Sequence, residues 1–104
     1  MKYSDTDMKD ANWDMIPQHL KRGIHNYIIY GYPVGGFLTA VFRNDLRGAV
    51  MRADRESLAG LDNILKFFHW YAPLGCIGSI EIHMEWIKIK GMRGKGITDC
   101  PDAI

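Results

Sequence analysis

Apolar residues recur every three or four positions in several stretches of the chain, and this spacing predicts amphipathic helices. The first of these helices ends at Tyr30, because Gly31 supplies a left-handed stop and Pro33 prevents continuation. Asp14 is the candidate N-cap, and Pro17 suits the first turn because its missing N–H costs nothing there. The apolar stripe of this helix consists of Leu20, Ile24, Tyr27 and Ile28.

The same spacing predicts two further helices in the middle of the chain. One begins at Phe37 and extends to Ala53, with a bend or break near Gly48 because glycine weakens a helix interior by roughly 1 kcal/mol. The next is capped by Asp54 and ended by Pro73. Its stripe consists of Leu58, Leu61, Leu65, Phe68 and Ala72.

Residues 79–90 fit two patterns, a strand and a helix. Residues 80–86 alternate between apolar and polar, which is typical of a strand. Ser79 is a capping residue, however, and Ile80, Met84 and Ile87 also share a helical face. We favour the helix, because no partner strand is evident to receive backbone hydrogen bonds.

These patterns predict an all-α fold, a single small domain of about four short helices with flexible N- and C-terminal arms. Residues 1–14 carry four aspartates and two lysines without helical periodicity, and residues 91–104 begin with three glycines in six positions. The helical domain is therefore expected to span 15–90. A core this thin favours a homo-oligomer, with Trp70 and Trp86 covering the interface.

Composition narrows the class of partner. Thirteen basic and twelve acidic residues give a formal net charge of +1, which argues against a strongly electrostatic nucleic-acid binder. No apolar run approaches the ~20 residues of a membrane span, and Met1 opens a polar segment rather than a secretory signal. With two cysteines in 104 residues, we expect free thiols and a bacterial host cytoplasm rather than a disulfide framework or a membrane.

Several short motifs resemble those of a widespread group of small phage-encoded proteins. That group has an Ile-Pro-x-His opening, a Pro-x-Gly-Gly-Phe-Leu turn, Asn-Asp-Leu and Arg-Ala-Asp segments, and a Cys-Trp-Gly-Ser loop before the last helix. The resemblance implies a phage accessory protein and supplies no catalytic mechanism. This chain departs from the group at two positions. Ile77 stands where the loop of the group has tryptophan, and Ile80 stands where the group usually has proline. The matching positions are 16–19, 33–41, 44–46, 52–54 and 76–79.

The turn at Gly35 and Gly36 is the first candidate for ligand binding. Backbone N–H groups at a helix start, unshielded by a Cβ, bind phosphate or carboxylate groups. The motif lacks the Gly-Lys-Ser/Thr of a Walker loop and the preceding strand of a dinucleotide fingerprint. The structural alternative is a turn that needs glycine for tight helix approach.

Polar and aromatic residues after this turn extend the candidate site. Arg43, Asn44 and Asp45 offer donors and acceptors suited to a base edge or a ribose. The alternative for Asp45 is an intramolecular polar lock to Arg52 or Arg55. Trp70 lies off the core stripe, so it either stacks a base or a partner protein or packs against the last helix.

The hypothesis that follows is a non-catalytic protein, not an enzyme, that sequesters a small phosphorylated or nucleotide-like molecule, such as a host immune signal. The predicted ligand-binding residues are Gly35, Gly36, Arg43, Asn44, Asp45, Arg52 and Trp70. No cofactor or metal is expected, because the histidines and cysteines lack ligand-type spacing. The alternative is an inhibitor or adaptor that binds a host protein through an aromatic surface. A nucleic-acid regulator is the weakest alternative, since acidic residues interleave with the basic ones.

Overall fold

Seven α-helices and one 3-10 turn form the part of the chain described by the computed structural model, residues 11–73 and 75–94. No strand occurs in these ranges, so the all-α prediction is confirmed, with more helices than the four expected. In chain order they are η1 (Trp13–Met15), α2 (Gln18–Tyr30), α3 (Gly36–Phe42), α4 (Leu46–Arg52), α5 (Arg55–Ala59), α6 (Leu61–Trp70), α7 (Ile80–Lys88) and α8 (Gly91–Gly94).

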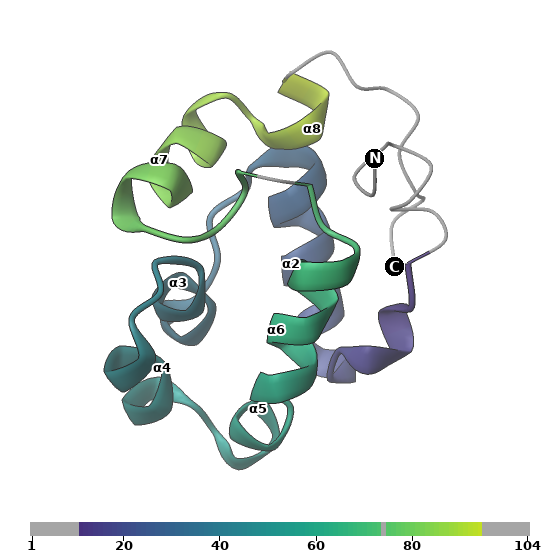
Figure 1. Ribbon diagram of the computed structural model, residues 1–104, viewed down its shortest axis with the longest axis vertical. Coiled ribbons are helices and arrows are strands. Elements are labelled where there is room, and N and C mark those ends of the chain that lie inside the picture. Colours follow the sequence, from purple (N-terminus) through teal and green to yellow (C-terminus); the bar gives the residue numbers. More distant parts are fainter. Residues whose placement is uncertain (1–10, 74, 95–104) are drawn as a thin grey trace.

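Helix α2 runs through the middle of the molecule and the other helices are arranged around it (Figure 1). Helices α3 and α7 lie on one side, α4 and α5 at the end where α2 begins, and α8 packs against the end where α2 finishes. Apolar side chains from most of these helices form one core. Its fully buried members include Ile24, Ile28, Ile29, Phe42, Ile64 and Phe67.

Tyr27 organises the centre of this core. Its ring stacks on Phe42 with centroids 4.3 Å apart, and its hydroxyl donates a 2.6 Å hydrogen bond to the carbonyl of Cys76. Burial raises the pKa of the Tyr27 phenol well above its ordinary range, so the hydroxyl stays a donor. Trp86 donates from Nε1 to the Tyr27 carbonyl at 2.8 Å and is 2% exposed. The expectation that Trp86 covers an interface is therefore wrong, because this side chain is part of the core.

Local capping chemistry places several helix ends where the sequence predicts them. Asp54 accepts a 2.7 Å hydrogen bond from the Ser57 N–H and begins α5. Ser79 accepts one from the Ile82 N–H at 3.1 Å, so residues 80–88 are a helix. Gly31 ends α2 with a φ of 69°, the left-handed conformation expected of a C-terminal glycine.

Two predicted long helices are broken, at positions that apolar spacing does not reveal. The first break follows α3, where Asn44 adopts a φ of 61° and Asp45 begins α4. The predicted break at Gly48 is wrong, because that residue lies inside α4. The second break is at Gly60, between α5 and α6. Asp14 also fails as a cap, because it lies in η1 and Pro17 occupies the N-cap position of α2.

Residues on both sides of the predicted domain limits pack against the helices. The Trp13 ring lies 4.7 Å from that of Phe67, between centroids. Met92, in α8, is 1% exposed. The limits at 15 and 90 stay predictions, and most of the two predicted flexible arms lies outside the described residues. Within those residues, no helix has the length and apolar character needed to cross a membrane.

Candidate functional site

Three predicted ligand-binding residues line one pocket of about 230 Å³. They are Gly35, Gly36 and Arg52, and a Cβ on Gly36 would lie 3.1 Å from the Arg52 Cδ. A side chain at this position would therefore require the Arg52 side chain to shift by a few tenths of an ångström. Nη1 of Arg52 donates to the Gly48 carbonyl at 3.3 Å. The other lining residues are His19, Leu20, Phe37, Leu38, Asp54 and Ser57.

The polar groups of this pocket already engage one another. His19 Nε2 lies 3.1 Å from the Ser57 hydroxyl and 3.5 Å from an Asp54 carboxylate oxygen, and His19 Nδ1 lies 3.6 Å from Glu56. Hydrogen bonds from Ser57 lower the pKa of Asp54, so the pocket is lined by a carboxylate as well as by Arg52. An anion entering here would meet one cation and one fixed negative charge, and this balance does not favour a phosphate group.

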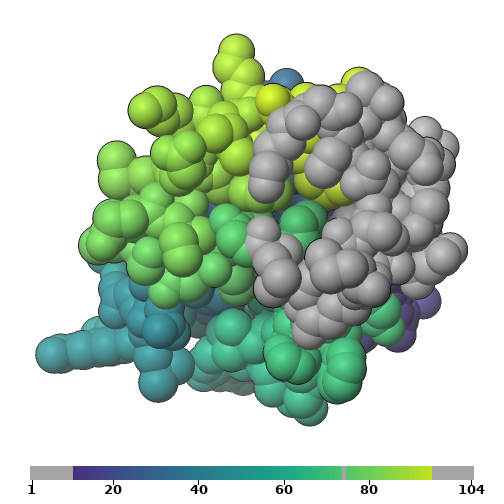
Figure 2. Space-filling view, turned by 45° about the horizontal axis from the view of Figure 1, so that its top comes forward, coloured from purple at the N-terminus to yellow at the C-terminus, as the bar shows by residue number. Residues whose placement is uncertain are grey.

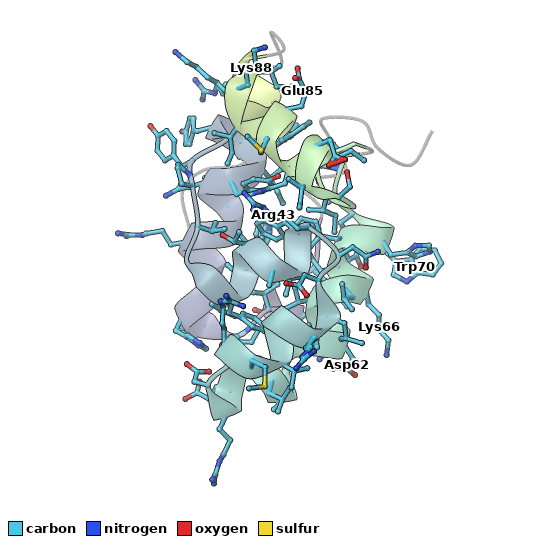
Figure 3. All side chains as sticks on the ribbon, turned by 90° about the vertical axis from the view of Figure 1, so that its left-hand side faces the viewer. Arg43, Asp62, Lys66, Trp70, Glu85 and Lys88 are labelled. Carbon is cyan, nitrogen blue, oxygen red and sulfur yellow. The ribbon has the colours of Figure 1, made fainter. Side chains whose placement is uncertain are left out.

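Arg43 lies where α3 meets α7 (Figure 3). Its Nε–H donates a 3.0 Å hydrogen bond to Nδ1 of His83, a side chain that is 2% exposed. Arg43 therefore ties the end of α3 to α7. It does not line the pocket of Gly35, Gly36 and Arg52.

Asn44 and Asp45 build the turn between α3 and α4. A carboxylate oxygen of Asp45 accepts a 3.0 Å hydrogen bond from the Gly48 N–H, which caps α4. A Cβ on Gly48 would collide with that carboxylate, so the cap also explains the glycine. This hydrogen bond is a local cap within α4 and not the predicted lock to Arg52 or Arg55, and Arg52 donates instead to the Gly48 carbonyl. Asn44 and Asp45 also border an apolar groove of about 40 Å³, which is too small for a nucleotide.

Replacing Asp45 with alanine should lower the free energy of unfolding by ~1 kcal/mol, because the first turn of α4 loses its cap. Asp45→Asn is the matched control, since an amide oxygen still accepts from Gly48. Urea denaturation measures both variants. Equal stability of the alanine and asparagine variants would show that the cap contributes nothing.

Trp70, the last predicted site residue, lies at the end of α6 and is 59% exposed. Its ring meets that of His69 edge-on, with centroids 4.9 Å apart. Figure 3 shows it pointing away from the body of the molecule, remote from Arg43. The structure thus distributes the seven predicted residues over several places rather than gathering them into one site.

A larger pocket, of about 520 Å³, lies where α2 ends and α8 begins. Figure 2 looks onto this end of the molecule, where α7 and α8 form the yellow-green surface. Tyr30 and Tyr32 stack at the pocket with centroids 5.2 Å apart and ring planes 28° apart. The Arg93 guanidinium lies over the Tyr30 ring, 5.6 Å from its centroid. Gly31, Ile87, Lys90 and Gly94 complete the described lining.

Close backbone contact between two glycines brings these residues together. Gly31 and Gly91 both have positive φ, 69° and 66°. A Cβ on Gly91 would lie 2.6 Å from the Gly31 nitrogen and 2.8 Å from the carbonyl oxygens of Ile28 and Ile29. The start of α8 therefore fits against the end of α2 only because neither glycine carries a side chain. This contact places Arg93 beside the tyrosine pair.

The chemistry of this pocket suits a flat, negatively charged molecule. Tyrosine faces stack on planar rings, and an arginine stacked on an aromatic ring keeps its N–H edge for oxygen anions. Lys90 adds a second positive charge. No aspartate or glutamate occurs among the described residues that line the pocket. The first pocket differs in this respect, because Asp54 and Arg52 both line it.

Sequence reasoning missed this pocket because its two groups of residues are about 60 positions apart, and because Arg93 and Gly94 fell in a predicted flexible tail. Two signals were present. Tyr30 and Tyr32 flank the glycine that ends the first helix, and basic residues recur at 88, 90, 93 and 95. Neither signal alone predicts a site, because only the packing of α8 against α2 joins them.

The chain matches no protein family, no curated protein and no solved structure. The resemblance to small phage-encoded proteins therefore stays a prediction. No group of three or more His, Cys, Asp or Glu in the described residues could hold a metal ion.

Proposed function

We propose that this chain is a non-catalytic binder of a small, phosphorylated, nucleotide-like molecule, and that the ligand occupies the pocket at Tyr30, Tyr32, Lys90 and Arg93. The observation that carries the proposal is the stacked tyrosine pair beside two cations in a pocket of about 520 Å³. Pockets of roughly 300–1,000 Å³ are typical of small-molecule sites. The proposal keeps the predicted class of ligand and changes the residues that bind it.

Each part of the ligand has a complementary group. A base or other planar ring would stack on Tyr32, which is 55% exposed. Phosphate oxygens would accept hydrogen bonds from Arg93 and from Lys90. Binding without chemistry would match sequestration, as expected for a phage accessory protein.

The test is a thermal-shift screen against cyclic nucleotides and ADP-ribose derivatives, together with native mass spectrometry of protein purified from cells. A ligand at 100 times its dissociation constant stabilises the folded state by about 2.7 kcal/mol, which raises Tm by several degrees. No shift with any compound and no retained small molecule would contradict the proposal.

Substituting Arg93 with glutamine should raise the dissociation constant of the ligand found in this screen by about tenfold or more, because a charge-assisted hydrogen bond is lost. Isothermal titration calorimetry measures the change. Arg52→Gln is the matched control, since Arg52 lines the other pocket. If only Arg52→Gln loses affinity, the ligand binds at the predicted residues Gly35, Gly36 and Arg52 and the proposal is wrong.

A protein-binding role is the second candidate, favoured by exposed large apolar residues on α4 and α6. Met51 is 76% exposed, Leu46 67% and Trp70 59%. Exposed apolar side chains of this size supply contact area when a partner protein binds. This role is compatible with ligand binding at α8, because the two sets of residues belong to different elements.

A further inference from the structure

Lys90 has an uncommon backbone conformation at the pocket of about 520 Å³ between α2 and α8, which we name the α8 pocket. Its φ is 64°, in the left-handed region, where glycine or asparagine is the usual residue after a helix. A Cβ on Gly31 would lie 2.9 Å from the Lys90 Cα, so this backbone packs directly against the end of α2. Its N–H donates to the Ile87 carbonyl and its carbonyl accepts from the Gly94 N–H, both at 3.1 Å. A lysine kept at a position that favours glycine points to a use for its side chain.

The two cations of the α8 pocket have no acidic partner in the part of the chain that the structure describes. Neither Lys90 nor Arg93 forms an ion pair there, whereas Lys66 pairs with Asp62. Glu85, the acidic residue nearest to Lys90 along the chain, lies on α7 and is not part of the described lining (Figure 3). Two uncompensated positive charges therefore line the same pocket.

The tyrosine pair separates the ring end of a ligand from its charged end. Tyr30 already has neighbours, because Tyr32 stacks on it, the Arg93 guanidinium lies over it, and the His25 ring meets it edge-on with centroids 6.2 Å apart. Tyr32 is 55% exposed and is the ring on which a base can stack. The two cations are then left for the phosphate end.

We infer that the ligand of the α8 pocket carries two negative charges at its phosphate end, as a phosphate monoester or a pyrophosphate does, and that Lys90 selects it over a singly charged phosphodiester. A ligand covers the cations as it binds, and a covered cation without an anion is costly. One negative charge compensates one of the two cations, whereas two negative charges compensate both. This inference rests on the proposed function and makes Lys90 its specificity-determining residue.

Calorimetric titration of the full chain with two sets of nucleotides tests the inference. The 5′-monophosphates of adenosine, guanosine, cytidine and uridine carry a phosphate monoester, with a charge of about −1.5 to −2 at pH 7. Their 3′,5′-cyclic forms have the same base and sugar and carry a singly charged diester. At least one monophosphate should bind about tenfold or more tightly than its cyclic form, because a charge-assisted hydrogen bond is lost in the cyclic form.

Three variants assign this preference to Lys90. Lys90→Gln should raise the dissociation constant of that monophosphate about tenfold and affect the cyclic form less, so that the two affinities converge. Lys90→Arg keeps the positive charge and should keep the preference. Lys66→Gln is the matched control, because it removes the same charge from α6, outside the described lining of the α8 pocket, and should change neither affinity. Circular dichroism shows that each variant is folded.

Two results would overturn the inference and leave the proposed function standing. One is cyclic forms that bind as tightly as the monophosphates, and the other is a preference that Lys90→Gln retains. Binding by none of these nucleotides would overturn it as well, even if another compound of the thermal-shift screen binds. The proposed function itself fails only when the whole screen is negative, so the two failures are distinguishable.

Discussion

Alanine at position 91 is expected to destabilise the fold by ~2–5 kcal/mol, because it combines backbone strain with a steric clash. Left-handed backbone costs an alanine about 1–2 kcal/mol, because its Cβ approaches the neighbouring carbonyl. The new methyl would also meet the Gly31 nitrogen at 2.6 Å. Overpacking of this kind costs typically 1–3 kcal/mol, and here backbone atoms rather than a flexible side chain would have to move.

Two other glycines separate the contributions to this effect. Gly75 has a φ of 85° and open space where a methyl group would lie, so Gly75→Ala should show the backbone strain alone. Gly35 has open space and an ordinary φ of −70°, so Gly35→Ala should cost only the poorer N-capping of α3 by alanine, on the order of 0.5–1 kcal/mol. Urea denaturation of the three variants should rank the destabilisation in the order 91, 75, 35.

Gly91→Ala should also weaken ligand binding, because displacement of α8 carries Arg93 away from Tyr30. The readout is the thermal shift by the same ligand, measured at a temperature where the variant is folded. If Gly91→Ala loses no more stability than Gly75→Ala, the contact between α2 and α8 has room for a methyl group and the steric argument is wrong. Intact ligand binding in a strongly destabilised variant would place the ligand elsewhere.

The helix ends that were predicted correctly are those determined by local capping chemistry. Asp54, Ser79 and Gly31 each act within three or four residues of their own position, so sequence alone shows where α5 and α7 begin and α2 ends. The break at Asn44 escapes such reasoning because Leu46 continues the apolar spacing of α3. In the structure Leu46 is 67% exposed. The apolar spacing therefore continues onto the surface and does not show that the helix continues.

The candidate pocket depends on a contact between distant parts of the chain. The sequence correctly predicts Gly31 as the stop of α2, and its second role, receiving the backbone of Gly91, has no local signature. At the predicted anion site the residues come together as expected, but their charge balance differs from the expectation. Gly35, Gly36 and Arg52 do come together, and Asp54, predicted as a helix cap, is the group that offsets the positive charge beside them.

His83 is the second position where a large effect is expected, because its ring is buried with one nitrogen unsatisfied. Nδ1 accepts a hydrogen bond from Arg43, so the proton of the neutral ring is on Nε2. Nε2 is buried without a hydrogen-bond partner among the described residues. The ring packs against Tyr27 and Phe42, with centroids 5.4 Å and 6.0 Å away. A buried unsatisfied donor costs about 1–3 kcal/mol.

Burial, and secondarily the positive charge of Arg43, lower the pKa of His83 below its ordinary 6.5. In the unfolded chain the imidazole takes up a proton as the pH falls through 6.5, whereas in the folded chain it stays neutral to lower pH. The unfolded state therefore binds more protons in this window. The free energy of unfolding should fall as the pH is lowered from about 7.5 toward 5.5, and the decrease should end once the folded state is protonated too.

Replacing His83 with leucine, a residue of similar size, should remove this pH dependence and raise the free energy of unfolding by ~1–3 kcal/mol near pH 6. The gain arises because the unsatisfied Nε2–H is gone and Arg43, which is only half-buried, can turn to water. Met84→Leu, at an exposed position on the same helix as His83, is the matched control: it changes no titratable group and should leave the slope unchanged. Denaturant titrations at several pH values measure both. A less stable His83→Leu variant that keeps the wild-type slope would show that the His83 ring is satisfied and does not control acid stability.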